Sequence, residues 1–286
     1  MKIAVLSDIH ANFVALNTAV EHIETWKPDF VIVAGDLVNR GPRPMECLRL
    51  IQEKSKSQNW LMVRGNHEDY VISQANPLEP RSGPAFEVHR ASFWTYQQLN
   101  RNIAPLQEMP FQQSLLDPNG NEIRFVHASM SGNRDGIYPE TSDESLALKI
   151  FPNGTHRSKV PLVLFCVGHT HRPLIRSLNG VLIINAGSAG LPFDGDKRLS
   201  YAQLSWENGL WEAEIIRLKY DTSEAEHDFI ASGYLEGGGP LVRLVQIELK
   251  TASSQLYNWA VKYQEPARRG EISMRDSVHQ YLQSIQ

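Results

Sequence analysis

Three short apolar segments alternate with two amphipathic segments near the start of the chain, and this order restricts the fold more than any other feature of the sequence. The apolar segments, each long enough for one buried strand, are Lys2–Leu6, Phe30–Ala34 and Trp60–Val63. Between them, Asn12–Thr25 and Pro44–Lys56 place apolar residues at helical spacing. A β-α-β-α-β order predicts parallel strands that are covered by helices.

The middle and the end of the chain are predicted to be helical. Asn76–Pro84 contains three prolines and a glycine, which indicates a loop, and the helical segment Ala85–Leu106 follows it. We therefore expect an inserted helical cap over about residues 72–110. A C-terminal helical extension is expected over about residues 222–286, either packed on the core or forming the contact of a homodimer. Its predicted helices are Thr222–Gly233, Ala252–Gln264 and Ile272–Gln283.

Further strands are expected between the cap and the extension. Two hairpins are predicted by turns that contain Asn-Gly, one before Glu122 and one before Trp211. The segments concerned are Phe111–Leu116, Glu122–Val126, Leu162–Val167, Val181–Ile184, Tyr201–Trp206 and Trp211–Leu218. Because no internal repeat is present, we expect one domain over residues 1–286.

Polar side chains that can bind metal ions follow five of the predicted strands. In α/β sheets, sites form at the carboxyl ends of the strands. Five of the ten histidines lie there. The residues are Asp8, His10, Asp36, Asn66, His67, His127, His169 and His171.

These residue types suit a pair of transition-metal ions. Imidazole suits Zn, Fe, Ni and Mn, and carboxylate and amide oxygens suit harder ions. Two metals about 3.5–4 Å apart require a bridging carboxylate. Asp8 and His10 lie two residues apart, as do His169 and His171, so each pair can face one centre. Four neighbouring glycines are expected to let the backbone turn sharply beside the metals: Gly35, Gly41, Gly65 and Gly168.

The ordered set of motifs resembles the signature of the calcineurin-like metallophosphoesterases. The matching blocks are Asp8-x-His10, Gly35-Asp36, Gly65-Asn66-His67-Glu68, His127 and Gly168-His169-Thr170-His171. The later stretch Asn185–Gly190, followed by Asp194-Gly-Asp196, resembles the small bacterial and archaeal phosphodiesterase branch. This resemblance implies an α/β sandwich of two mixed β-sheets flanked by helices, with the site at one edge.

The resemblance also implies two sets of metal ligands. The first set is Asp8, His10, Asp36 and His171, and the second is Asp36, Asn66, His127 and His169. Asp36 would therefore bridge the two metals. The implied cofactors are two divalent transition-metal ions, with Mn expected first and Fe, Zn or Ni as alternatives.

The implied activity is that of a dinuclear metal-dependent phosphodiesterase acting on a small phosphate ester or nucleotide. A metal-bridging hydroxide would attack phosphorus in line. His67 would be the general acid that protonates the leaving alkoxide. Arg40 would bind phosphate oxygens through its guanidinium.

Asn39 departs from the pattern of the Ser/Thr protein phosphatase branch. That branch has an aspartate at this position, and the aspartate orients the catalytic histidine. Asn39 is therefore expected to be a turn residue. The orienting charge on His67 is then absent, or it comes from a neighbour such as Glu68 or Asp69.

Two alternative functions follow from the mixture of motifs. Arg40 and Glu68 are typical of the phosphatase branch, whereas the pair of His169 and His171 is typical of the phosphodiesterase branch. A Ser/Thr protein phosphatase or a phosphomonoesterase is therefore the first alternative. A non-catalytic scaffold on the same fold is the second, and the presence of His67 and of every ligand argues against it.

Composition excludes several partners and indicates a compartment. Lys and Arg total 28, Asp and Glu total 32, and the net charge is −4. No large positive field is available, so non-specific binding of nucleic acid is not expected. Two cysteines cannot form a disulfide framework, which favours the cytoplasm. The longest apolar stretch, Val160–Val167, is too short to span a bilayer, so no membrane association is expected.

Overall fold

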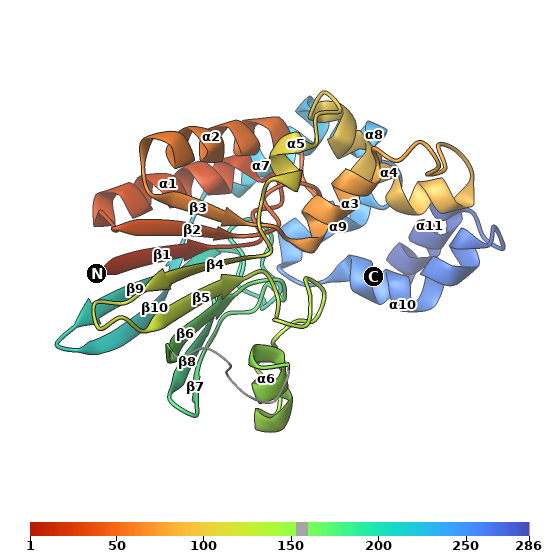
Figure 1. The fold of residues 1–286 in the computed structure, drawn as a ribbon. Coiled ribbons are helices and arrows are strands. Elements are labelled where there is room, and N and C mark those ends of the chain that lie inside the picture. Colours follow the sequence, from red (N-terminus) through yellow and green to blue (C-terminus); the bar gives the residue numbers. More distant parts are fainter. Residues whose placement is uncertain (153–159, 286) are drawn as a thin grey trace.

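Two five-stranded sheets pack face to face in this computed structural model, which describes residues 1–152 and 160–285 (Figure 1). The strands of the first sheet are β1 (Lys2–Leu6), β2 (Phe30–Ala34), β3 (Trp60–Val63), β9 (Leu199–Glu207) and β10 (Leu210–Leu218). The strands of the second sheet are β4 (Gln112–Leu116), β5 (Glu122–Val126), β6 (Leu162–Val167), β7 (Leu174–Leu178) and β8 (Val181–Asn185). Their spatial orders are β10-β9-β1-β2-β3 and β4-β5-β6-β8-β7.

Both sheets are mixed. Strands β1, β2 and β3 are parallel, and β9 and β10 continue that sheet in antiparallel pairs. In the second sheet β5, β6 and β8 are parallel, and β4 and β7 are antiparallel edges. The predicted sandwich of two mixed sheets with helices outside is therefore confirmed, and the carboxyl ends of its parallel strands point to one end of the molecule.

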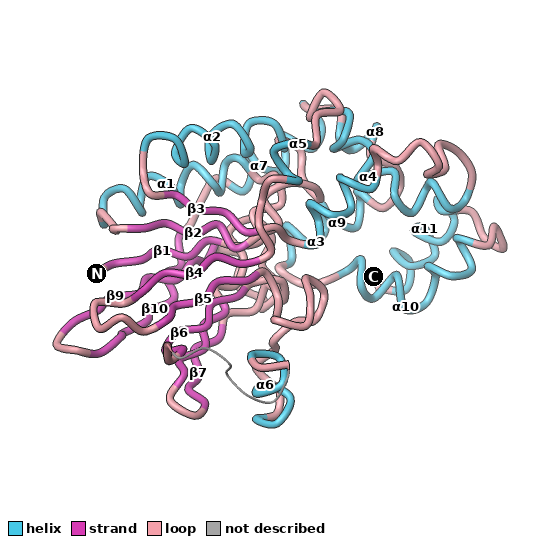
Figure 2. Tube along the Cα trace, in the orientation of Figure 1, coloured by secondary structure: helices cyan, strands magenta, loops and turns pink. Residues whose placement is uncertain are grey.

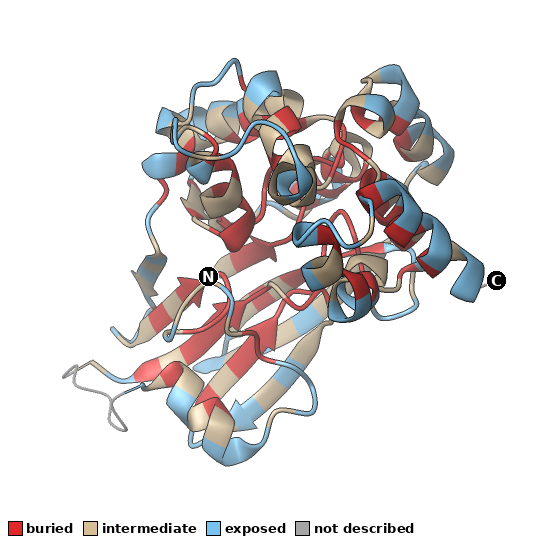
Figure 3. Cartoon of the chain, turned by 90° about the vertical axis from the view of Figure 1, so that its right-hand side faces the viewer, coloured by how far each residue is buried: buried red, intermediate tan, exposed pale blue. Residues whose placement is uncertain are grey.

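The central strands are buried on both faces, which explains their unbroken apolar sequences. On β1, Ile3 and Val5 face the second sheet and pack in one core with Phe125. Leu6, on the opposite face of the same strand, packs with Leu16 under the outer helices. Side chains alternate between the faces of a strand, so two-sided burial requires apolar residues at consecutive positions. Figure 3 shows these central segments as buried and the outer faces of the helices as exposed.

Helices cover the outer faces of both sheets. The first sheet is covered by α1 (Phe13–Trp26) and α2 (Pro44–Ser57), close to the predicted bounds. The Asn12 side chain accepts a hydrogen bond from the Ala15 backbone N–H at 3.1 Å, which caps the start of α1. The second sheet is covered by α6 (Asp143–Ile150).

The other helices gather in one layer beyond the carboxyl ends of the strands, where Figure 2 shows the helices on one side of the molecule. They are α3 (Asn66–Ser73), α4 (Pro84–Gln98), α5 (Ala104–Gln107), α7 (Thr222–Ala231), α8 (Tyr234–Gly237), α9 (Val242–Thr251), α10 (Gln255–Arg268) and α11 (Met274–Ser284). Helix α4, from the inserted segment, contacts α8, α10 and α11 from the C-terminal segment. Among the described helices, none combines the length and apolar character needed to cross a bilayer.

Several elements differ from the sequence-based prediction. Helices α3, α6, α8 and α9 and strand β7 were not predicted. The predicted helix Ala85–Leu106 is interrupted after Gln98, where Asn100 and Arg101 take left-handed φ values of 53° and 59°. Ala252, predicted to start a helix, instead ends α9 with φ 51°. Non-glycine residues seldom adopt this conformation, so sequence propensity does not indicate such breaks.

We predict that the core between the sheets dominates stability. Ile32 on β2 is fully buried there, whereas Leu116 on β4 is 61% exposed. Ile32→Ala should lower the free energy of unfolding by about 2–5 kcal/mol through lost contacts and a cavity. Leu116→Ala, the matched control, should change it by less than about 0.5 kcal/mol. Urea unfolding followed by circular dichroism measures both, and equal losses would contradict the prediction.

Candidate metal centre

The loops after the strands hold their polar residues in an unusual backbone conformation. Five of the predicted ligands have left-handed φ values between 49° and 68°: Asp8, His10, Asp36, His169 and His171. Such strain at a non-glycine residue costs about 1–3 kcal/mol and is concentrated at functional sites. The loops are fastened to one another, since the Asp8 N–H donates to the Gly35 carbonyl at 3.1 Å and the His10 N–H to the Asp36 carbonyl at 2.9 Å.

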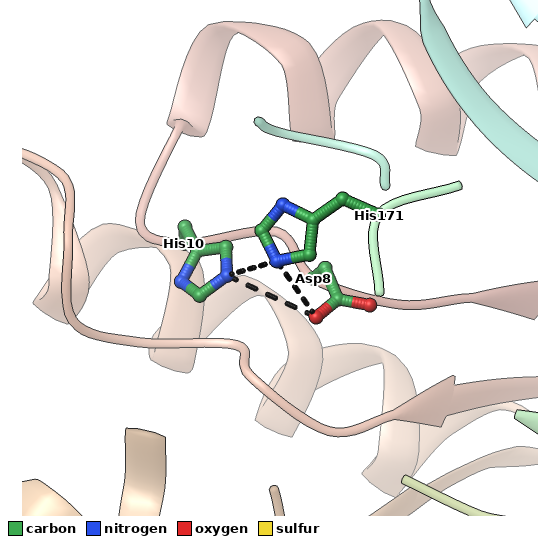
Figure 4. A group of neighbouring side chains, drawn as sticks. All are labelled: Asp8, His10 and His171. Carbon is green, nitrogen blue, oxygen red and sulfur yellow. Dashed lines mark hydrogen bonds and ion pairs between the residues drawn. The ribbon is translucent and has the colours of Figure 1, made fainter. Parts of the chain in front are cut away.

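Asp8, His10 and His171 converge in one buried cluster (Figure 4). The Nε2 atoms of His10 and His171 lie 3.1 Å apart. Asp8 Oδ1 lies 3.2 Å from His171 Nε2 and 3.8 Å from His10 Nε2. The three residues are 3% exposed or less. The structure thus brings together three members of the first predicted set.

The second predicted set also converges. His127 Nε2 lies 3.3 Å from Asp36 Oδ2 and 3.0 Å from Asn66 Oδ1. His169 Nδ1 lies 2.9 Å from the same Asn66 oxygen. Asp36 Oδ2 is also 3.8 Å from His10 Nε2, so one carboxylate oxygen faces both sets. This is the geometry expected of a bridging ligand.

The hydrogen bonds of the outer ring nitrogens of three histidines fix which ring nitrogen faces the site. The outer Nδ1 of His10 contacts the Asn39 carbonyl at 3.3 Å, and that of His127 contacts the Ala34 carbonyl at 2.8 Å. The Nδ1 of His171 contacts the Leu191 carbonyl. Because a carbonyl can only accept, each Nδ1 carries the proton, and in the neutral rings each Nε2 presents a lone pair.

A cation fits this arrangement. Lone pairs that face each other at 3.1 Å, as those of His10 and His171 do, repel unless a positive charge lies near them. Asp8 Oδ1 is buried and has no hydrogen-bond donor among the described residues. A backbone carbonyl behind a histidine is a common way to orient a metal ligand. The residues present therefore fit a metal ion, and their N and O donors suit a transition metal.

The charges of the site are strongly coupled. Burial raises the pKa of Asp8 and Asp36, but neighbouring histidines outweigh it and hold both below the ordinary value. Burial lowers the pKa of His127, but the charge of Asp36 outweighs it and raises the pKa to about 10. Burial lowers the pKa of His169 to about 4. Of these groups, His127 is thus the one that carries positive charge next to the buried carboxylates.

Glu68 holds the loops together. It is fully buried, and its carboxylate accepts hydrogen bonds at 2.8–3.1 Å from the backbone N–H groups of Asp36, Val38 and Gly65. Burial, followed by the charge of Asp36, raises its pKa to about 7. Asp69 pairs with Arg64 at 3.1 Å. The expectation that Glu68 or Asp69 orients His67 is therefore wrong.

Asn39 is the residue that contacts His67. Its Nδ2 lies 3.0 Å from His67 Nδ1 and donates to Ser92 Oγ at 3.0 Å, so both amide protons are used. His67 Nδ1 then accepts, and the neutral ring carries its proton on Nε2. Asn39 does have a left-handed φ of 68°, as a turn residue can, but it also orients the ring. Asn39 occupies the motif position at which the phosphatase pattern has an aspartate that orients the histidine, and this correspondence could have indicated its role.

His67 and Arg40 lie at the border between the metal ligands and a pocket. The His67 and His10 rings meet edge to face at 4.7 Å. Burial lowers the pKa of His67 to about 3, so the ring is neutral. Arg40 and His67 line the same pocket of about 480 Å³. The structure thus places both predicted catalytic residues beside the metal ligands.

The glycines act mainly by their small size. Only Gly35, of the four predicted turn glycines, has a positive φ, at 86°. A Cβ atom on Gly65 would lie 2.2 Å from Asp36 Oδ1, and one on Gly168 would lie 1.8 Å from Ser7 Oγ. Gly41, Gly65 and Gly168 do not have a positive φ, and at these positions the lack of a side chain allows neighbouring loops to approach closely.

Sequence comparisons match the chain to one family and to curated proteins. The profile of the family described as calcineurin-like phosphoesterase matches residues 1–177. The protein MJ0912 of Methanocaldococcus jannaschii is 28% identical over 243 residues, which cover 78% of this chain and 89% of that protein. A symmetrical bis(5'-nucleosyl)-tetraphosphatase of Stutzerimonas stutzeri is 39% identical over 51 residues, which cover 18% of each chain.

Solved structures share the fold. A metallophosphoesterase from Sphaerobacter thermophilus has a TM-score of 0.67 and 27% sequence identity, and the match covers 88% of this chain and 99% of that one. The protein PH1004 of Pyrococcus horikoshii has a TM-score of 0.68 and 20% identity, with 84% and 97% covered. The likeness to both extends well beyond residue 177.

We predict that a methyl group at Gly65 disrupts the metal ligands. Gly65→Ala places a Cβ against the Asp36 carboxylate and backbone, so it should lower both stability and the amount of metal bound. Gly120→Ala, in the turn between β4 and β5, is the matched control, because its added methyl group would meet no atom within 4 Å and only the φ of 81° is strained. The control should cost about 1–2 kcal/mol of stability and leave metal binding intact. Metal content after dialysis and thermal unfolding distinguish the two variants, and full metal content in Gly65→Ala would contradict the prediction.

Proposed function

The chain belongs to the calcineurin-like phosphoesterase family, and from this premise we propose that it is a dinuclear metal-dependent phosphodiesterase. The family implies hydrolysis of phosphate esters. The two sets of ligands and the preference for diesters are parts of the proposal. Mn is the ion we propose first, with Fe, Zn and Ni as alternatives that the same donors accept.

One observation carries the proposal. The Nε2 atoms of His10 and His171, whose Nδ1 atoms face backbone carbonyls, lie 3.1 Å apart beside a buried Asp8 oxygen that lacks a donor among the described residues. Without a cation, this arrangement of lone pairs is electrostatically unfavourable. Its persistence in a strained backbone is expected if the folded chain normally binds cations there.

The chain's own residues divide the chemistry between them. Bound divalent ions supply a water nucleophile at neutral pH and offset the negative charge of the phosphoryl oxygens. We propose that Asp8, His10, Asp36 and His171 hold one ion, and that Asp36, Asn66, His127 and His169 hold the other. Arg40 would bind a phosphoryl oxygen through its guanidinium fork.

His67 is proposed to protonate the leaving oxygen. The Asn39 amide donates a hydrogen bond to His67 Nδ1. The proton of the His67 ring therefore resides on Nε2 and is available for donation. A positioned general acid contributes about 10²–10⁴-fold, and its contribution is largest when the leaving group is a poor one. Because an amide replaces the aspartate of the phosphatase pattern, no carboxylate stabilises a charged ring from that side. Together with the His169 and His171 pair, this favours the phosphodiesterase branch over the protein phosphatase branch.

The helical segments are proposed to belong to the same domain as the sandwich, over residues 1–286. Helix α4 of the insertion contacts α10 and α11 of the C-terminal extension, and α1 of the sandwich contacts α7.

The two cysteines, Cys47 and Cys166, are buried and unpaired. A cytoplasmic location is our proposal on that ground.

The function is tested by metal-dependent hydrolysis. We expect the chelator-stripped protein to be inactive and to regain activity with Mn, and we expect bis(4-nitrophenyl) phosphate to be hydrolysed faster than 4-nitrophenyl phosphate. Separate assays with Fe, Zn, Ni and Mg compare the ions. A preference for the monoester would overturn the diester assignment in favour of the phosphatase alternative. No turnover with any ion would overturn the catalytic proposal and leave a scaffold.

We predict that His67→Ala lowers kcat without removing the metals. The loss should be about 10²–10⁴-fold on a diester with an alkyl leaving group. It should be smaller with nitrophenolate, which departs without a proton. Metal content is measured on the same preparation, with His22→Ala on α1 as the control histidine. Equal losses on both leaving groups would contradict the assignment of His67 as the acid.

A further inference from the structure

A pocket of about 480 Å³ opens on the side of His67 that faces the helical layer. Its walls come from α3, α4, α9 and α10, which lie together beyond the strand ends in Figure 1. Helices α9 and α10 lie after residue 177, where the family profile ends. Part of the pocket wall next to the proposed general acid therefore comes from residues outside the matched family profile.

The charged side chains that line the pocket favour an anion. Arg40 and Arg134 line the pocket, and no aspartate or glutamate does. Four other surface pockets each include at least one carboxylate, and Arg134 lies at the border with one of them, which contains Asp69 and Asp135. Within residues 1–152 and 160–285 neither Arg40 nor Arg134 forms an ion pair. Two unpaired guanidiniums in one pocket favour a negatively charged occupant.

One aromatic ring, that of Tyr70, contacts both Arg134 and the proposed general acid His67. The guanidinium carbon of Arg134 lies 4.7 Å from the centre of the Tyr70 ring. Tyr70 in turn meets the His67 ring edge to face at 5.1 Å. The cation is thus separated from the acid by one tyrosine. A group bound to Arg134 therefore belongs to the part of the substrate that leaves, whereas Arg40 lies in the loop beside the metal ligands.

The opposite wall is apolar and includes an uncovered aromatic ring. Val88 of α4 and Leu256, Tyr257 and Ala260 of α10 line it. Tyr257 is 68% exposed, a high fraction for a tyrosine beside a pocket. A flat apolar group can stack on such a ring, and a nucleobase does so with any base identity.

The apolar wall is fixed in place from beneath. Glu248 of α9 is fully buried, and its Oε1 accepts hydrogen bonds from the Gln255 and Leu256 N–H groups at 2.8 Å each. These donors belong to the first turn of α10, which carries Tyr257. The carboxylate therefore sets the position of the wall relative to the rest of the pocket, in the manner of a helix cap.

We propose, building on the proposed function, that this pocket binds the leaving group and that the leaving group is a nucleotide, with its own phosphate on Arg134 and its base against Tyr257. In the step, the water oxygen bonds to phosphorus and the bond from phosphorus to the nucleotide oxygen breaks. The His67 proton passes to the departing oxygen, and a proton from the water restores His67. The products are a free nucleotide and a phosphate ester of the remaining group.

Binding of the leaving group tests the proposal without catalysis. Calorimetric titration of the metal-free protein compares its affinity for AMP with its affinities for the two components of AMP, adenosine and inorganic phosphate. We expect AMP to bind at least about tenfold more tightly than either, since each part adds one favourable contact. Equal binding of AMP and adenosine would overturn the phosphate subsite, and equal binding of AMP and phosphate would overturn the base subsite.

Two variants at exposed positions separate the contacts. Arg134→Gln should reduce the preference for AMP over adenosine about tenfold, and Tyr257→Ala should reduce the preference for AMP over phosphate by a similar factor. Arg275→Gln, on α11 and in a different pocket, is the matched control and should change neither ratio. Thermal unfolding verifies that all three variants fold. An unchanged ratio in Arg134→Gln would overturn the role of this arginine.

Hydrolysis of two matched diesters then separates this inference from the proposed function. The dinucleotides pApA and ApA contain the same phosphodiester. When its bond from phosphorus to the 3′ oxygen breaks, the leaving group is AMP in pApA and adenosine in ApA, and analysis of the products verifies which bond breaks. We expect kcat/KM to be about tenfold higher for pApA, and this ratio to fall in Arg134→Gln. Equal hydrolysis of both would overturn the inference and leave the phosphodiesterase proposal standing. Hydrolysis of neither, together with no turnover of the nitrophenyl diester, would overturn the proposed function itself.

Discussion

The mutual repulsion of unprotonated imidazoles and buried carboxylates at the strand ends is the constraint around which the structure is built. His10 and His171 approach each other through their lone pairs at 3.1 Å, and Asp8 lies beside them with one oxygen that finds no donor among the described residues. Backbone carbonyls behind the rings prevent them from turning away or exchanging tautomers. Such a cluster is stable only with positive charge inside it, and among the chain's own groups His127 carries such a charge beside Asp36.

A rigid scaffold is needed to keep these groups together. Several ligands sit in left-handed backbone conformations, and adjacent loops approach so closely that a methyl group on Gly65 or Gly168 would collide with a neighbouring side chain. The strain is opposed by strands buried on both faces, whose carboxyl ends cannot shift without opening the core between the sheets. Glu68 completes the connection, because its carboxylate joins the loops after β2 and β3 through three backbone hydrogen bonds.

The proposed reactive groups and most of the pocket wall come from different parts of the chain. The matched family region, residues 1–177, contains the predicted metal ligands, His67 and Arg40. The inserted helix α4 and the later helices α9 and α10 form most of the pocket beside them. Asn39 links the two regions, since its amide contacts both His67 and Ser92 of α4. A shift of α4 would therefore alter the orientation of the proposed acid.

The sequence by itself determined the order of the first strands and helices and the identity of the clustered residues, because buried apolar runs and polar residues at strand ends are local patterns. The sandwich of two sheets was implied by the resemblance of its motifs to a known family. It could not indicate α3, α9 or the break after Gln98, since these depend on left-handed residues and on packing against distant helices. Only the tertiary structure decided that Asn39, and not Glu68, orients His67, and that helices far apart in the sequence enclose one carboxylate-free pocket. The reason is physical: a hydrogen bond or a pocket wall depends on the distance between groups, and in a fold with long-range strand pairing that distance is set by the packing of the whole chain.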